Sequence, residues 1–157
     1  MPKAQKICLV LLRLSLGFMY LYAGLNKVLD SAWTSQGYLE SAKGFSAFYA
    51  WLASPSLLPA VDFMNEWGLT LLGVSLILGI FVRLSGVLGA TLMLLYYLPL
   101  GFPYPNEHAL IVDEHIIYAS ALLYLAAIQA GRVYGLDAWC AKLPICKRFP
   151  KFRNILG

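Results

Sequence analysis

Three consecutive residues, Asp113, Glu114 and His115, combine two carboxylates with an imidazole at the start of an apolar segment. Imidazole exchanges a proton near neutral pH, and a neighbouring carboxylate can orient the ring or relay that proton. Glu66 places a further carboxylate near the start of another apolar segment. Because quinone reduction consumes protons as well as electrons, we predict that these four residues are catalytic and handle protons beside an apolar quinone slot. The alternative is a structural hydrogen-bond network, with acids favoured at a helix start by its dipole.

A stripe of polar and small residues runs along the first apolar segment at helical spacing. It comprises Arg13, Gly17, Tyr20, Gly24 and Lys27. Charged side chains within hydrocarbon usually face a bundle interior or a cavity, so the stripe is predicted to form a wall of a quinone- or anion-binding cavity. The alternative is helix packing, in which the glycines permit close approach and Lys27 extends toward the membrane surface. For Arg13, packing or lipid pairing is the favoured interpretation.

Four residues are predicted to bind the quinone or an anionic substrate. Asn26 and Lys27 would polarise a carbonyl or bind an anion, and Tyr20 lies on the same stripe as Lys27. Tyr118 follows His115 by three positions and shares its face if this segment is helical. These residues would surround the ring, while the carboxylates and imidazole would handle protons.

Positioning these groups requires several membrane-spanning helices. The chain is 60% hydrophobic and only 13% charged, and four segments approach the length of about 20 apolar residues that a helical span needs. They cover about 7–29, 62–82, 84–101 and 109–131. The sequence therefore predicts an all-α fold: one integral membrane domain built as a four-helix bundle.

The segment between the first and second spans is too long for a structureless loop. We predict that 34–53 forms an amphipathic helix lying on the membrane surface. Its apolar face would contain Tyr38, Ala42, Phe45, Tyr49 and Leu52. A simple interfacial anchor is the favoured role, and a lid over a pocket is the alternative.

The cations predict the orientation of the spans. If the four spans alternate, nine Lys and Arg residues lie on one side and only Lys27 and Lys43 lie on the other. The cation-rich side is expected to be cytoplasmic, which places both termini on the cytoplasmic side of the cell membrane. The basic tail, 132–157, directly follows an apolar segment, so we expect it to face anionic lipid and not nucleic acid.

Several classes of redox site do not fit the sequence. The two histidines, His108 and His115, are seven residues apart and would share one helix face, which prevents them from clamping a haem from opposite sides. The Glu-x-x-His pairs of di-iron bundles and the glycine-rich nucleotide motifs are missing from the sequence. We therefore predict no bound metal, haem or flavin. Cys140 and Cys146 also lack the C-x-x-C spacing of a redox pair.

Three stretches of the sequence resemble the DoxX/DoxD family. They are Arg13 and Gly17 followed by 22–27 in the first span, 68–83 in the second, and 113–118 with 131–137 around the fourth. The resemblance implies a four-helix membrane protein. It also implies a subunit similar to DoxD of thiosulfate:quinone oxidoreductase, which oxidises thiosulfate to tetrathionate, passes the electrons to quinone and has a partner subunit.

Two considerations keep a second function open. Thiosulfate is a dianion, whereas the side opposite the termini would carry seven of the eight acidic residues, so a partner would have to supply cationic contacts. Other members of the family that the sequence resembles are implicated in redox-stress complexes or serve as membrane accessory proteins. The alternative to a quinone-linked subunit is therefore a non-catalytic accessory subunit, with its partner in the same membrane.

Overall fold

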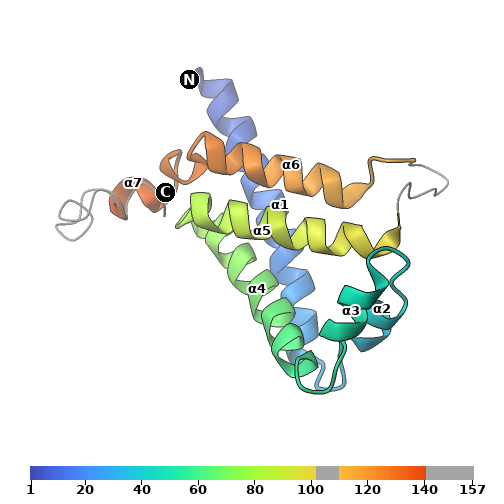
Figure 1. The fold of residues 1–157 in the computed structure, drawn as a ribbon. Helices are drawn as coiled ribbons and strands as arrows, with labels where there is room; N and C mark the ends of the chain where they lie inside the picture. Colours follow the sequence, from blue (N-terminus) through green and yellow to red (C-terminus); the bar gives the residue numbers. More distant parts are fainter. Residues whose placement is uncertain (102–109, 141–157) are drawn as a thin grey trace.

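The computed structural model describes residues 1–101 and 110–140, which form helices joined by loops (Figure 1). The main helices are α1 (Lys3–Leu29), α4 (Leu58–Leu78), α5 (Val82–Tyr97) and α6 (Glu114–Ala127). The shorter ones are α2 (Gln36–Glu40), α3 (Ser46–Leu52), η1 (Leu98–Leu100), η2 (Ala130–Arg132) and α7 (Asp137–Cys140). Most of the predicted basic tail, 141–157, lies outside the described residues.

Three helical segments are long and apolar enough to cross a bilayer: α1, α4, and α5 continued through η1. α6 is a shorter apolar helix of 14 residues, equivalent to about 21 Å. The chain is thus a multi-pass helical membrane protein, which confirms the predicted all-α membrane bundle.

The predicted fourth span, 109–131, is longer than the helix in the structure, and its first residue lies outside the described ranges. Asp113 has an extended backbone and is the N-cap of α6, because its side chain accepts a hydrogen bond from the Ile116 N–H. At the other end Gln129 adopts a left-handed conformation with φ 52°, which the helix cannot continue through. Caps at both ends therefore fix the length of α6.

The second and third spans begin earlier than predicted. α4 starts at Leu58 with Pro59 in its first turn, where proline is tolerated, and ends at Gly79 with φ 65°. The predicted end of this span at residue 82 is wrong, since that residue already begins α5. The turn between the two helices is only three residues long, which makes α4 and α5 neighbours along the chain.

The single interfacial helix predicted over 34–53 is also wrong, since the segment forms two short helices, α2 and α3. The backbone N–H groups of Lys43 and Gly44 donate to the Pro99 carbonyl at 2.8 and 3.2 Å, and Phe45 takes a left-handed φ of 52°. These bonds to η1 replace the helical bonds that would have continued α2. Tyr49 is consequently buried while Phe45, from the same predicted face, is exposed.

The helices pack chiefly as two pairs, α1 with α4 and α5 with α6, and Figure 1 shows the second pair crossing the first. Glycines make the α1–α4 approach close: a Cβ on Gly24 would lie 2.4 Å from the Thr70 nitrogen, and one on Gly73 would lie 2.4 Å from the Leu21 nitrogen. The packing interpretation of the small residues along α1 is therefore supported for Gly24.

Candidate functional site

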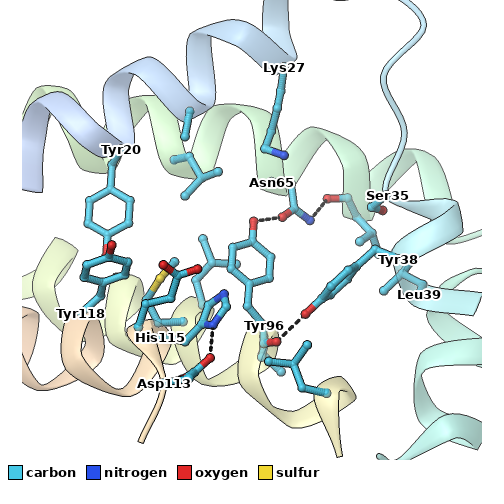
Figure 2. A pocket seen from close by; sticks show the side chains of 18 of the residues that line it. Tyr20, Lys27, Ser35, Tyr38, Leu39, Asn65, Tyr96, Asp113, His115 and Tyr118 are labelled. Atoms are coloured by element: carbon cyan, nitrogen blue, oxygen red, sulfur yellow. Dashed lines mark hydrogen bonds and ion pairs between the residues drawn. The ribbon is translucent and has the colours of Figure 1, made fainter. Parts of the chain in front are cut away.

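A cavity of about 950 Å³ lies where the ends of the four main helices meet α2 and α3 (Figure 2). We call it the tyrosine-lined cavity, because Tyr20, Tyr38, Tyr96 and Tyr118 form part of its wall. Its size falls within the range typical of small-molecule sites. Much of the remaining wall is apolar and includes Met19, Ala23, Leu39, Leu69, Leu92 and Met93.

Tyr20 contributes a buried hydroxyl that has no hydrogen-bond partner among the described residues. The residue is 2% exposed, and its ring meets the Tyr118 ring edge-on with centroids 6.3 Å apart. Figure 2 shows the two rings together on one side of the cavity. An unpaired buried hydroxyl is costly, so a ligand acceptor that reached this oxygen would gain a bond that the protein alone does not make.

His115 and Asp113 are in direct contact in the cavity, with 2.6 Å between Nδ1 and Oδ2. The other carboxylate oxygen of Asp113 caps α6, so the helix start fixes the carboxylate and the carboxylate fixes the ring. Nε2 of His115 has no hydrogen-bond partner among residues 1–101 and 110–140, and the ring stands beside Tyr96 within the cavity (Figure 2). This arrangement leaves Nε2 available to exchange a proton with a ligand.

A second hydrogen-bonded group lines the cavity next to His115. The Tyr96 hydroxyl donates to Oδ1 of Asn65, whose Nδ2 donates to the Val61 carbonyl at 2.9 Å. The Tyr38 hydroxyl donates to the backbone oxygen of Tyr96, which ties α2 to α5 (Figure 2). Tyr49 makes a similar tie through its hydroxyl to Leu95, and burial raises the pKa of this phenol, which keeps it a donor.

Lys27 lies at the mouth of the cavity, where its ammonium sits 4.0 Å from the centre of the Trp33 ring. Such a cation–π contact holds the charge near the membrane surface. Asp62 does not line the cavity; it accepts hydrogen bonds from Thr34 and Ser35 and so anchors the start of α2 to α4. The cavity is thus closed on one side by a segment fastened to two main helices.

Six of the eight predicted site residues line this cavity: Tyr20, Lys27, Asp113, Glu114, His115 and Tyr118. The structure places Asn26 on an exposed face of α1 and Glu66 outside the lining. Glu114 is exposed at the edge. Helix phase explains the difference at position 66, because its neighbour Asn65 takes the inward face.

The sequence did not single out Asn65 or Tyr96, whose side chains are hydrogen-bonded to each other in the cavity wall. A signal for Asn65 was present, since an amide within a predicted span is costly and usually faces the interior. The sequence contains a weaker signal for Tyr96, because Tyr96 and Tyr97 are adjacent and lie on different sides of α5. Only the contact with α4 distinguishes them.

A second polar cluster lies at the opposite end of the helices; we call it the Arg13 cluster, formed by Arg13, Ala130, Val133, Tyr134 and Asp137. The guanidinium of Arg13 is buried and donates to the backbone oxygens of Ala130, Val133 and Tyr134 at 2.8, 3.0 and 3.2 Å. It is wedged so tightly that a Cβ on Gly79 or on Gly135 would lie 2.8 Å from Nη1. Of the two interpretations favoured for Arg13, packing and lipid pairing, this arrangement corresponds to packing within the protein.

Asp137 completes that cluster by capping α5. Its two carboxylate oxygens accept hydrogen bonds from the N–H groups of Phe81 and Val82 at 2.7 and 3.3 Å. Burial raises the pKa of Asp137, against the opposing effect of these amides and of Arg132 and Arg13. The cluster therefore joins α1, the turn before α5 and the chain after α6 through bonds made within the protein.

Metal ligands do not gather in the described part of the chain: no three His, Cys, Asp or Glu side chains there come close enough to hold an ion. The polar groups of the tyrosine-lined cavity are hydroxyls, an amide, a lysine, carboxylates and one imidazole. This set suits an uncharged ligand with hydrogen-bond acceptors and an apolar body.

The sequence model of the DoxX family matches residues 8–99, from the second turn of α1 through the end of α5. The search of curated proteins gives no match, and the search of solved structures gives none either.

Proposed function

The chain belongs to the DoxX family, and we propose that it is the membrane subunit of a quinone-linked oxidoreductase, with the quinone bound in the tyrosine-lined cavity. The observation that carries this proposal is the unpartnered hydroxyl of Tyr20, buried in the wall of an otherwise largely apolar cavity. A quinone supplies both requirements: a carbonyl oxygen for the hydroxyl and an apolar ring for the surrounding side chains.

Proton transfer in this proposal falls to His115. Reduction of a quinone to a quinol takes up two electrons and two protons. Nε2 of His115 would deliver one proton to one ring oxygen, and the second proton would come from the solvent at the same membrane surface. Asp113 contacts Nδ1 at 2.6 Å and keeps Nε2 directed at the ligand. Asp113 lies at the start of α6, so the imidazole can regain its proton from the solvent at that membrane surface.

The electrons must come from a donor outside the cavity, and we propose that a partner subunit handles it. For a thiosulfate-type enzyme, two thiosulfate ions would form tetrathionate and release the two electrons. Lys27 is engaged with Trp33, and only Lys43 adds a further cation on the side opposite the predicted cytoplasmic surface, where Asp30, Glu40, Asp62 and Glu66 also lie. This charge balance disfavours binding a dianion to the chain alone, so we assign donor oxidation to the partner.

A non-catalytic accessory subunit remains the second candidate, favoured by the exposed aromatic residues at this end of the molecule: Phe45, Trp51, Phe63 and Trp67. Aromatic side chains are enriched in protein interfaces. Aromatic side chains are also enriched in the headgroup region of a bilayer. Purification separates the two candidates.

Gentle detergent extraction from the native membrane, followed by mass spectrometry of bound proteins and extracted lipids, tests the proposal. We expect about one quinone per chain together with an electron-donating partner. A large complex with no quinone attributable to this chain would make it an accessory subunit instead.

Variants then test the roles of individual residues. His115→Gln retains a polar side chain but cannot exchange a proton, and we expect quinone reduction by the complex to fall about 100-fold with little change in quinone affinity. Glu66→Gln is the matched control, because Glu66 lies outside the cavity lining. Equal loss in both variants would assign the proton chemistry elsewhere.

A further inference from the structure

A second cavity, of about 520 Å³, lies at the end of the molecule that contains the Arg13 cluster. The start of α1, the end of α4 and the loop from η2 to α7 enclose it. We call it the Lys6 cavity; it is lined by Lys6, Leu78, Arg132, Val133, Tyr134, Gly135, Leu136 and Ala138. None of the roles proposed for the tyrosine-lined cavity involves it.

The charge of its lining is one-sided, with two cations, Lys6 and Arg132, and no carboxylate. Asp137 acts on Arg132 through space, but its side chain is buried and its oxygens accept hydrogen bonds from the amides that start α5. Arg13 lies close enough to offset the charge of Asp137. Among the described residues, the lining of the cavity therefore contains cations and no carboxylate side chain.

Its surroundings match the headgroup level of a bilayer. Tyr134 and Trp139 are 71% and 60% exposed, and aromatic rings with a polar atom concentrate at that level. Leu78 and Leu136 place exposed apolar side chains at the cavity wall. A ligand here meets cations and hydrocarbon together.

We propose that the Lys6 cavity binds the phosphate of an anionic phospholipid, with Lys6 and Arg132 contacting the headgroup and the acyl chains lying over Leu78 and Leu136. Basic pockets between membrane helices bind anionic headgroups in this way. Because the loop from η2 to α7 also supplies the carbonyls that hold Arg13, a bound lipid stabilises the packing of this end. Inorganic phosphate offers the same anion without the acyl chains.

Thermal unfolding of the purified, delipidated chain in neutral detergent tests the proposal. Added phosphatidylglycerol is expected to raise the unfolding temperature more than phosphatidylcholine does, and sodium phosphate at the same concentration is expected to have little effect. Lys6→Gln should weaken the apparent phosphatidylglycerol affinity about fivefold, and Arg132→Gln by a similar factor. Lys3→Gln, an equal change of charge one turn away on α1 and outside the lining, is the matched control.

The outcomes are distinct. A loss confined to Lys6→Gln and Arg132→Gln supports the site. Equal losses in Lys3→Gln would show attraction by general charge and overturn it. Equal stabilisation by sodium phosphate would overturn the lipid as the ligand, and equal stabilisation by phosphatidylcholine would overturn the role of the anionic headgroup.

Discussion

The Arg13 cluster and the tyrosine-lined cavity place polar groups at opposite ends of the same helices but differ in how those groups are satisfied. In the Arg13 cluster, three carbonyls accept from the two terminal nitrogens of one guanidinium, and two amides donate to one carboxylate; only Nε of Arg13 lacks a partner among the described residues. In the cavity, the Tyr20 hydroxyl and Nε2 of His115 have no such partners among the described residues. Buried polar groups that the protein itself satisfies stabilise the fold, whereas those left unpaired beside a cavity mark a ligand site.

Removing Arg13 should have the largest effect on stability. Arg13→Met removes three hydrogen bonds to backbone oxygens and takes away a charge that offsets Asp137, so we expect a loss on the order of 3 kcal/mol in the free energy of unfolding. Lys27→Met, at the cavity mouth, removes only a cation–π contact and should cost less than about 1 kcal/mol. Denaturation in mixed micelles measures both; equal losses would contradict the distinction between the two ends.

The sequence predicted much of this comparison but not its details. The stripe on α1 indicated both Arg13 and Tyr20, and periodicity alone did not show that one meets backbone oxygens and the other a cavity. The bonds to Arg13 come from residues 117 or more positions away, which only the folded chain brings together. The sequence likewise indicated Glu66, but the rotation of the helix directs Asn65 and not Glu66 into the cavity. It also could not show that hydrogen bonds from Lys43 and Gly44 to the Pro99 carbonyl would interrupt the predicted interfacial helix.

The glycine contact between α1 and α4 connects the two ends and should rank next in effect. Gly73→Ala would bring a methyl group to 2.4 Å from the Leu21 backbone, so the helices must separate, and we expect a loss of about 1–3 kcal/mol. Gly68→Ala, on the same helix, meets nothing within 4 Å and is the matched control. Comparable destabilisation in both would show that the contact with Leu21 does not cause the loss, because helix propensity alone favours alanine over glycine at both positions.

The pH dependence of the Arg13 cluster should be the smallest of these effects. Burial raises the pKa of Asp137 above its ordinary value of 3.8, so the unfolded chain releases this proton first as pH rises. Between 3.8 and the raised value the folded state binds more protons, and stability attributable to Asp137 falls with rising pH. Asp137→Asn removes this dependence, so between pH 4 and pH 8 the free energy of unfolding of the variant should fall less with rising pH than that of the wild type. Parallel curves would argue that Asp137 keeps its usual pKa in the folded chain.

Quinone-dependent stabilisation of Tyr20→Phe tests the central claim most directly. Without ligand, Tyr20→Phe should unfold at the same temperature as wild type or slightly higher, because it removes a buried hydroxyl that has no partner. A short-chain quinone should stabilise the wild type and the control Tyr22→Phe, whose ring is 72% exposed on the same helix, and should bind Tyr20→Phe about fivefold more weakly. Equal quinone affinity in all three proteins, or no stabilisation of the wild type, would contradict a quinone site at Tyr20.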